Sequence, residues 1–363
     1  MSTDGGENLL NPGDTPHDNA QFLVFCVAVI RAVARYPELL RVSVASAGND
    51  HRVGANEAPP AIISIFLGDQ LQDIMNQLEK GKPETTLPGG FMEVGASVLP
   101  KLPRDAGDRN RTSPFAFTGN KFEFRAVGSS APIYWPQTVL NTAVADSLAK
   151  LADELDKLKP GDFEGLTAIL SSVVKANKQV LFEGNGYSEE WHAEAARRKL
   201  PNNRTTVDAL PALTTATAKR LFSSFGVLSE RELASRVDIN WERYIKVQNI
   251  EASCAIDIAS TMILPATARY LGELAGAPSS RGINTICERV SGLADSLVDA
   301  IAALEHAQHD AHEAGSVHAE AKAFATVVIP AQEALRGVVD QLETLVADDL
   351  WPLPKYRELL FQY

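Results

Sequence analysis

From about Thr138 to the last residue, apolar side chains recur at the three- and four-residue spacing of amphipathic helices. Three segments of this region are long enough for many helical turns: 239–275, 281–314 and 317–349. Short breaks such as Gly276-Ala277-Pro278 separate them. Long helices with short connections pack side by side in antiparallel bundles. The sequence therefore predicts a mostly helical domain over residues 141–363.

The first 140 residues instead mix helix, strand and turn signals. The start signal Thr15-Pro16 and the apolar run after it predict a buried helix that ends at about Arg35. The elements expected next are a short strand, a second helix and a long loop, over residues 41–45, 62–78 and 81–108. A strand pair around Phe115 and Phe122 follows, with its turn at Thr118-Gly119-Asn120. The expected fold class of the whole chain is α+β.

The segment Lys121-Phe122-Glu123-Phe124-Arg125 carries the clearest chemical signal. In a strand, Phe122 and Phe124 point to one face, and the three charged residues point to the other. A carboxylate between two cations is costly to bury unless it meets water, a metal ion or a charged substrate. Arg109 and Arg111 add two guanidinium groups a dozen residues upstream. The pattern indicates a site for polyanions and divalent metal; the alternative is an exposed strand face with ordinary ion pairs.

Charge and composition restrict the functional classes. The formal net charge of -12 argues against general nucleic-acid binding, which needs a basic surface. The three cysteines form no CxxC pair, which is typical of buried thiols in a reducing cytoplasm. The longest apolar run, Phe22 to Ile30, is shorter than the roughly 20 residues that cross a bilayer. We therefore expect a cytoplasmic protein that binds neither nucleic acid nor membrane.

A histidine group also needs an explanation. His306, His309 and His312 lie three residues apart, among acidic residues. Histidine and carboxylate ligands on one helix face can bind a metal ion. Residues at i and i+6 diverge around a helix, so a polar helix end is the preferred interpretation.

Two motifs resemble those of glutamine synthetases, namely His51 to Pro59 and Asn110 to Arg125. Three further stretches narrow the resemblance to the type III family: residues 61–70, 186–191 and 226–232. This resemblance implies that residues 1–140 are the C-terminal part of a synthetase catalytic domain, with antiparallel strands backed by helices. It implies that residues 141–363 are the helical C-terminal domain of type III enzymes.

The resemblance also implies an activity, which is the synthesis of glutamine from glutamate, ammonia and ATP through γ-glutamyl phosphate. Arg52 matches the arginine that engages the substrate glutamate and the transferring phosphate. Glu57 matches the flap glutamate that shields the intermediate from water and accepts a proton from ammonium. Arg125 matches the arginine that holds the glutamate carboxylate. These three are the expected catalytic residues.

Nucleotide and metal binding follow from the same resemblance. Arg111 matches a nucleotide-phosphate arginine, and Lys121 stands where the bacterial type I pattern has another arginine. Glu123 resembles a metal-ligand glutamate, so the expected cofactors are ATP and Mg²⁺ or Mn²⁺. Ala116 replaces a further arginine of the type I pattern, and no phosphate contact is expected there. Family members form stacked rings of identical subunits, which implies a homo-oligomer, a dodecamer.

The chain departs from the family at its start. Met1-Ser2-Thr3-Asp4 resembles residues that follow the metal-binding histidine strand, so most metal ligands of the family precede this chain. Glu123 alone is expected to bind metal poorly, because hard divalent ions need several oxygen ligands. The chain by itself is therefore expected to be inactive. The alternatives are a non-catalytic homologue that joins full-length rings as an assembly or regulatory subunit, and a helical interaction protein that kept the site as a remnant.

Overall fold

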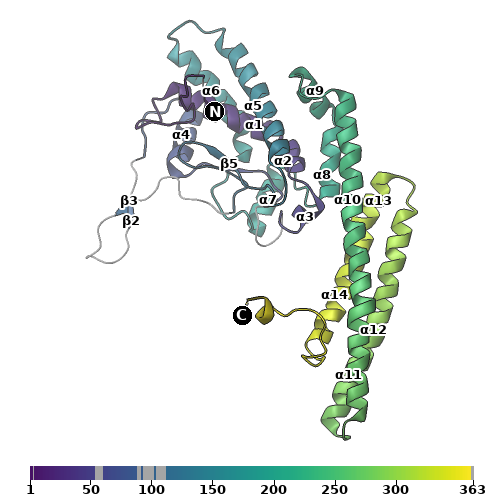
Figure 1. Ribbon diagram of the computed structural model, residues 1–363. Helices are drawn as coiled ribbons and strands as arrows, with labels where there is room; N and C mark the ends of the chain where they lie inside the picture. The colour runs from purple at the N-terminus through teal and green to yellow at the C-terminus, as the bar shows by residue number, and fades with distance from the viewer. Residues whose placement is uncertain (3, 54–59, 88–90, 93–101, 104–111, 361–363) are drawn as a thin grey trace. The chain divides into compact units, whose positions relative to one another are not determined.

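The structure is a computed structural model of the chain (Figure 1), and it describes residues 1–363 except 3, 54–59, 88–90, 93–101, 104–111 and 361–363. The chain forms two compact units, Met1–Val237 and Asp238–Tyr363.

The first unit is a layer of helices around a small sheet. Its strands are β1 (Ile65–Phe66), β4 (Phe115–Phe117) and β5 (Phe122–Phe124), with a separate pair β2 (Phe91–Met92) and β3 (Leu102–Pro103). Its helices before residue 140 are α1 (Ala20–Arg35), α2 (Pro37–Ser43), α3 (Ala47–Asp50), α4 (Asp69–Lys80) and the start of α5 (Tyr134–Leu155). Those beyond are α6 (Phe163–Asn177), η1 (Lys178–Val180), α7 (Glu189–Arg197), α8 (Thr206–Ala209), η2 (Leu210–Thr214), α9 (Ala216–Ser224) and the start of α10 (Glu230–Ile258).

Helix α1 is the central helix of this unit. It ends at Arg35 as predicted, but it begins at Ala20, because Asn19 supplies the cap by accepting a hydrogen bond from Phe22 N at 3.0 Å. Its apolar run is buried, including Cys26 and Ile30 at 0% exposure. α1 packs against α5 and α6.

Two predicted elements before the hairpin are wrong. Residues 41–43, predicted as part of a strand, end α2, because Pro37 and Glu38 start a helix that buries Leu39, Leu40 and Val42. The helix predicted over 62–78 is a strand followed by a helix. Gly68, at φ 80, separates β1 from α4.

The sheet has the order β1-β4-β5 and is mixed. β4 and β5 form the predicted antiparallel hairpin, in which Ala116 pairs with Glu123 and Gly119 has φ 84. β1 runs parallel to β4, so the expectation of purely antiparallel strands is wrong. Ile65 also forms a parallel bridge with Leu181. The backbone at Leu181 therefore lies along the edge of β1 that does not pair with β4.

The division near residue 140, inferred from the change in sequence character, is not where the compact units separate. Helices on both sides of that point share one core, since α5 and α6 pack on α1. The units divide instead at Val237, inside the continuous helix α10. Whether residue 140 ends the catalytic domain in the evolutionary sense stays a prediction.

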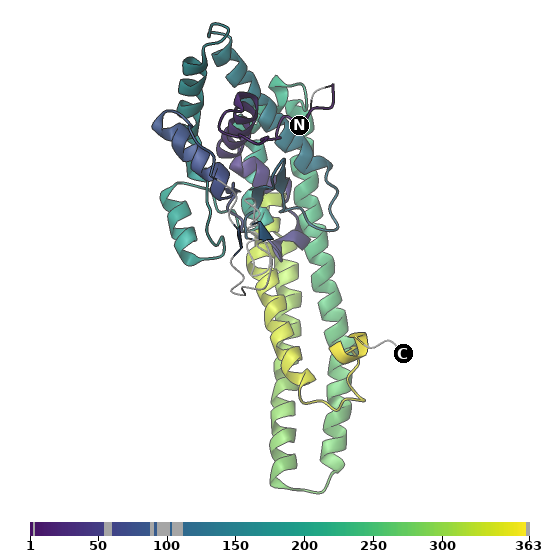
Figure 2. The ribbon, with the colours of Figure 1, turned by 90° about the vertical axis from the view of Figure 1, so that its left-hand side faces the viewer.

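The second unit is a bundle of long helices. It contains the remainder of α10, the π-helical turn η3 (Ala259–Ile263), α11 (Leu264–Gly276) and α12 (Arg281–His312). It continues with α13 (Val317–Ala323), the π-helical turn η4 (Phe324–Val328), α14 (Ile329–Glu343) and the short α15 (Tyr356–Leu360). α12 packs against both α11 and α14, and the two views show these helices side by side (Figures 1 and 2). The antiparallel bundle predicted from the three long periodic segments is confirmed.

One helical stretch of the described residues, Glu230–Gly276, has the length and apolar content that a membrane span requires. Within the most apolar 18-residue window of this stretch, 28% is buried inside the protein. Helices of a helical bundle meet the same two criteria, and Ala252, Ile263 and Ala266 of this stretch are buried within the unit. The expectation that the protein binds no membrane stays a prediction.

Candidate functional site

Glu123 in β5 lies between the charged residues that flank this strand, Lys121 and Arg125. Oε1 of Glu123 lies 3.8 Å from Nζ of Lys121, and its Oε2 lies 3.3 Å from Nε of Arg125. Thr118 Oγ1 donates a further hydrogen bond to Glu123 at 3.2 Å. Phe122 and Phe124 pack on Phe115 in β4 with ring centroids 5.5 and 5.7 Å apart. The predicted alternation of β5 is confirmed, and it places one carboxylate between two cations.

Arg52 lies two residues after the end of α3, and its side chain reaches the backbone beyond β5. Its Nη1 donates to Val127 O at 2.9 Å and to Asn49 Oδ1 at 3.3 Å. Val127 follows Arg125 by two residues. The fold therefore brings the first predicted motif to the end of the second one, although 75 residues separate Arg52 from Val127.

Asp50, two residues before Arg52, connects this region to residues beyond 200. Its two carboxylate oxygens accept hydrogen bonds from Thr206 N and Thr206 Oγ1, both at 2.8 Å. Arg41 is 2% exposed, and its Nη2 lies 3.7 Å from Asp50. Burial raises the pKa of Asp50 and lowers the pKa of Arg41, and each partner opposes the shift of the other. This buried pair was missed in the sequence, where Arg41 was assigned to a strand.

Glu183 is a second carboxylate that the sequence did not indicate. It accepts hydrogen bonds from Leu67 N at 2.9 Å and Gly68 N at 3.3 Å, at the start of α4. Burial raises the pKa of Glu183 to about 7, with a smaller contribution from Asp69, against the effect of the two backbone N–H groups. The carboxylate therefore joins the end of β1 to a distant turn.

The turn that follows Glu183 packs against the ends of both predicted motifs. Gly186 N donates to Thr112 Oγ1 at 2.8 Å. A Cβ atom at Gly186 would lie 2.7 Å from Thr112 O and 3.2 Å from Pro60 Cγ, so only glycine fits this approach. Phe182, just before the turn, stacks on Trp191, just after it, with ring centroids 3.7 Å apart.

The shifted pKa of Glu183 predicts a pH dependence of stability. The folded chain binds this proton more tightly than the unfolded chain, so the contribution is present below about pH 4.5 and is lost as pH rises through about 7. Glu183→Gln cannot ionise. We expect the free energy of unfolding of the variant, relative to the unsubstituted chain, to rise by about 1–2 kcal/mol between about pH 5 and about pH 8.

Urea denaturation at the two pH values measures this difference. Glu190→Gln is the matched control, because Glu190 is an exposed carboxylate in the first turn of α7. A gain in relative stability that is confined to Glu183→Gln identifies Glu183 as its source. A Glu183→Gln variant that behaves like the control would contradict the prediction.

Two predicted site residues, Glu57 and Arg111, lie outside the described residues. Within the described ranges, no group of three or more His, Cys, Asp or Glu side chains is placed to hold a metal ion. Glu123, the predicted metal ligand, lies within the described residues. The ring nitrogens of His312 bond Glu320 at 2.8 Å and Asn249 at 2.9 Å, so this histidine has protein partners as the polar interpretation expected.

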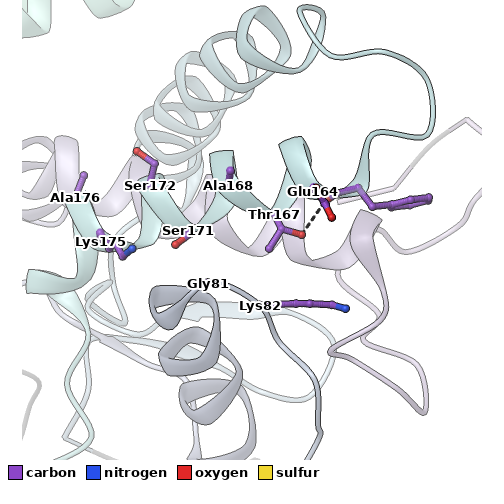
Figure 3. Close-up of a pocket in the computed structure, with 10 residues that line it drawn as sticks. Gly81, Lys82, Glu164, Thr167, Ala168, Ser171, Ser172, Lys175 and Ala176 are labelled. Atoms are coloured by element: carbon purple, nitrogen blue, oxygen red, sulfur yellow. Dashed lines mark hydrogen bonds between the residues drawn. The ribbon is translucent and has the colours of Figure 1, made fainter.

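A groove with a volume of about 880 Å³ lies elsewhere in the first unit, between α6 and the residues after α4. Figure 3 shows Thr167 and Ser171 of α6 facing Gly81 and Lys82 across it. Arg52, Lys121, Glu123 and Arg125 are not among the residues that line it. The charged site on β5 and this groove are separate features.

Comparison with known proteins defines the class. Residues 165–280 match the family model described as "Glutamine synthetase C-terminal domain". The matched region contains the Glu183–Gly186 turn and Thr206, which bond the sheet and Asp50. Residues 165–280 are thus similar to the C-terminal domain of glutamine synthetases.

Individual relatives extend the similarity to nearly the whole chain. The chain is 40% identical to the "Type-3 glutamine synthetase" of Dictyostelium discoideum, over 99% of this chain and 51% of that protein. It is 39% identical to a "Glutamine synthetase" of Bacteroides fragilis and 38% identical to one of Butyrivibrio fibrisolvens, of which it covers 52% and 53%. The resemblance to type III glutamine synthetases is confirmed, and the chain spans about half the length of the curated relatives it matches.

Proposed function

We propose that this chain is the part of a type III glutamine synthetase that contributes arginines and one metal ligand to the active site. In the proposed reaction, ATP transfers its γ-phosphoryl group to the glutamate side chain, which gives ADP and γ-glutamyl phosphate, and ammonia then displaces phosphate to give glutamine. The observation that supports this proposal is that Arg52, from the first motif, bonds the carbonyl oxygen of Val127, two residues after Arg125, while Arg125 pairs with Glu123 in the second motif. The relatives, named as glutamine synthetases, support the assignment.

The proposed roles follow the charges of the site. Arg125 is proposed to bind the substrate carboxylate, which a guanidinium group does through two parallel hydrogen bonds. Arg52 is proposed to engage glutamate and the transferring phosphate, where positioned cations stabilise the charge on the phosphoryl oxygens. Lys121 is 60% exposed at its side chain and is proposed to contact nucleotide phosphate. Glu57 and Arg111 complete the proposal as flap base and nucleotide arginine.

A divalent metal and ATP are implied by the family, with Mg²⁺ or Mn²⁺ as the ion. Among the residues that the structure describes, Glu123 offers one carboxylate, and hard divalent ions take about six or more oxygen ligands. The described residues therefore do not form a complete metal site. We propose that further ligands, the ring-shaped homo-oligomer and a cytoplasmic location belong to the protein of full family length.

The first test is the activity of the chain alone. We expect the purified 363-residue chain to show no ADP release that depends on glutamate and ammonia, because Glu123 is the one expected metal ligand among the described residues and hard divalent ions need several oxygen ligands. A chimera, in which this chain replaces the matching half of the Bacteroides fragilis protein, should show such release. Activity of the chain alone would contradict the first expectation, and an inactive, correctly assembled chimera would contradict the proposed function.

The alternative of an assembly or regulatory subunit predicts a different result. Mixing the chain with full-length synthetase subunits would then give rings that contain both polypeptides. Mass determination of the assembled rings distinguishes the two proposals. Mixed rings with altered activity, together with an inactive chimera, would favour the regulatory subunit.

A further inference from the structure

The side chain of Asn49 is enclosed by the residues that carry the proposed site. It is 3% exposed, although asparagine is usually found at the surface. Its Nδ2 donates to Val44 O at 2.6 Å and to Ala126 O at 3.0 Å. Its Oδ1 accepts the hydrogen bond from Arg52 Nη1 at 3.3 Å. All polar atoms of this amide are therefore used.

No other side chain reproduces this pattern of bonds. The site needs two donors toward two carbonyl oxygens and one acceptor toward a guanidinium group, which is the inventory of a carboxamide. An aspartate would place negative charge against the carbonyls of Val44 and Ala126. A glutamine is one methylene longer, and the space is limited, since a Cβ atom at Gly128 would lie 3.4 Å from Asn49 Oδ1.

The bonds of Asn49 connect two parts of the proposed active site. Ala126 directly follows Arg125, and Val127 accepts the second bond from Arg52. Asn49 O also accepts the backbone N–H of Arg52 at 3.0 Å. Both the backbone and one guanidinium nitrogen of Arg52 are thus held, and the hydrogen bonds of its side chain to described residues run through Nη1 alone.

We propose that Asn49 is a positioning residue, which fixes the guanidinium group of Arg52 relative to Arg125. This inference rests on the proposed function of these two arginines. Reacting groups must be held close to their productive geometry, and a displacement of about 1 Å can lower a rate about 10²-fold. The residue acts through Arg52 and does not contact the substrate.

The first test uses the 363-residue chain and phenylglyoxal, a reagent that modifies arginine side chains. Mass spectrometry measures the modification rate of Arg52, which is partly exposed. We expect Asn49→Ala to raise this rate about tenfold, the effect of losing about one net hydrogen bond. Asn49→Ser is the second variant in case the alanine variant does not fold, since its hydroxyl is too short to reach Arg52.

Ser46→Ala is the matched control. Ser46 Oγ caps α3 by accepting the N–H of Asn49 at 3.3 Å, so this variant weakens the same short helix without changing the Asn49 side chain. Its Arg52 modification rate should stay within about twofold of the unsubstituted chain. Equal rates in the Asn49 and Ser46 variants would overturn the proposal.

The second test is kinetic and uses the chimera. We expect Asn49→Ala to lower kcat/KM for glutamate about 10²-fold, with Ser46→Ala within about twofold. Combining Asn49→Ala with Arg52→Ala should add little to the effect of Arg52→Ala alone. Multiplicative losses in the double variant would overturn the positioning role. If the unsubstituted chimera lacks glutamate-dependent ADP release, the proposed function fails, while the phenylglyoxal rates still decide whether Asn49 anchors Arg52.

Discussion

Replacing Asp50 by alanine should lower the free energy of unfolding of the chain by about 3–5 kcal/mol. This loss of stability follows because the buried groups that bond the carboxylate would lose their partner. Arg41 is 2% exposed, and among the described residues it would keep hydrogen bonds to the carbonyl oxygens of Asn203 and Arg204, at 2.7 and 3.2 Å, and the weaker attraction of Asp208. Thr206 would lose the acceptor of both its N–H and its hydroxyl group. An uncompensated buried cation is among the most destabilising single changes in a protein.

Urea denaturation followed by circular dichroism measures this change. The matched control is Asp340→Ala, which removes an exposed pair with Arg336 at 3.5 Å and should cost about 0.5 kcal/mol or less. The double variant Arg41→Met, Asp50→Ala should recover much of the lost stability, because an apolar side chain replaces the unpaired cation. A loss below about 1 kcal/mol for Asp50→Ala alone would contradict the interpretation.

Replacing Arg125 by lysine should lower kcat/KM for glutamate in the chimera by about 10²-fold or more. The side chain of Arg125 is 19% exposed and lies beside Glu123, so it acts in a partly desolvated setting. Lysine keeps the charge but lacks the planar fork that binds a carboxylate through two hydrogen bonds. Because the proposed role concerns glutamate, KM for ATP should change little.

Steady-state kinetics of ADP release with glutamate and ATP varied in turn test this prediction. Arg197→Lys is the matched control, since Arg197 is 69% exposed and pairs with Glu194 on the surface of α7. Its kinetic constants should stay within about twofold. An Arg125→Lys variant that raises KM for ATP and leaves glutamate unaffected would move Arg125 to the nucleotide site.

The sequence predicted correctly those features that depend on residues close to one another in the chain. The alternation of Lys121 to Arg125 and the turn at Gly119 are local patterns, and both were predicted correctly. Long helices of the second unit were predicted from periodicity for the same reason. The segment Arg41 to Ala45 was not, because a short apolar run fits a strand and a helix equally well.

The residues that the sequence missed have distant partners. Asn49 bonds Ala126 across 77 residues, Glu183 bonds Leu67 across 116, and Asp50 bonds Thr206 across 156. No spacing rule connects such positions in one sequence. The resemblance to a family indicated which arginines face the substrate, but not which neutral or acidic side chains hold them in place.

The parallel bridge between Ile65 and Leu181 bears on how this polypeptide can be divided. A fragment that stops near residue 140 would lack the chain that covers this side of β1, where Ile65 is 0% exposed. Uncovered strand edges with apolar side chains recruit other chains, so we expect such a fragment to aggregate. Engineered fusions and split versions should therefore keep residues 1–237 on one polypeptide, and any junction should avoid the continuous helix α10.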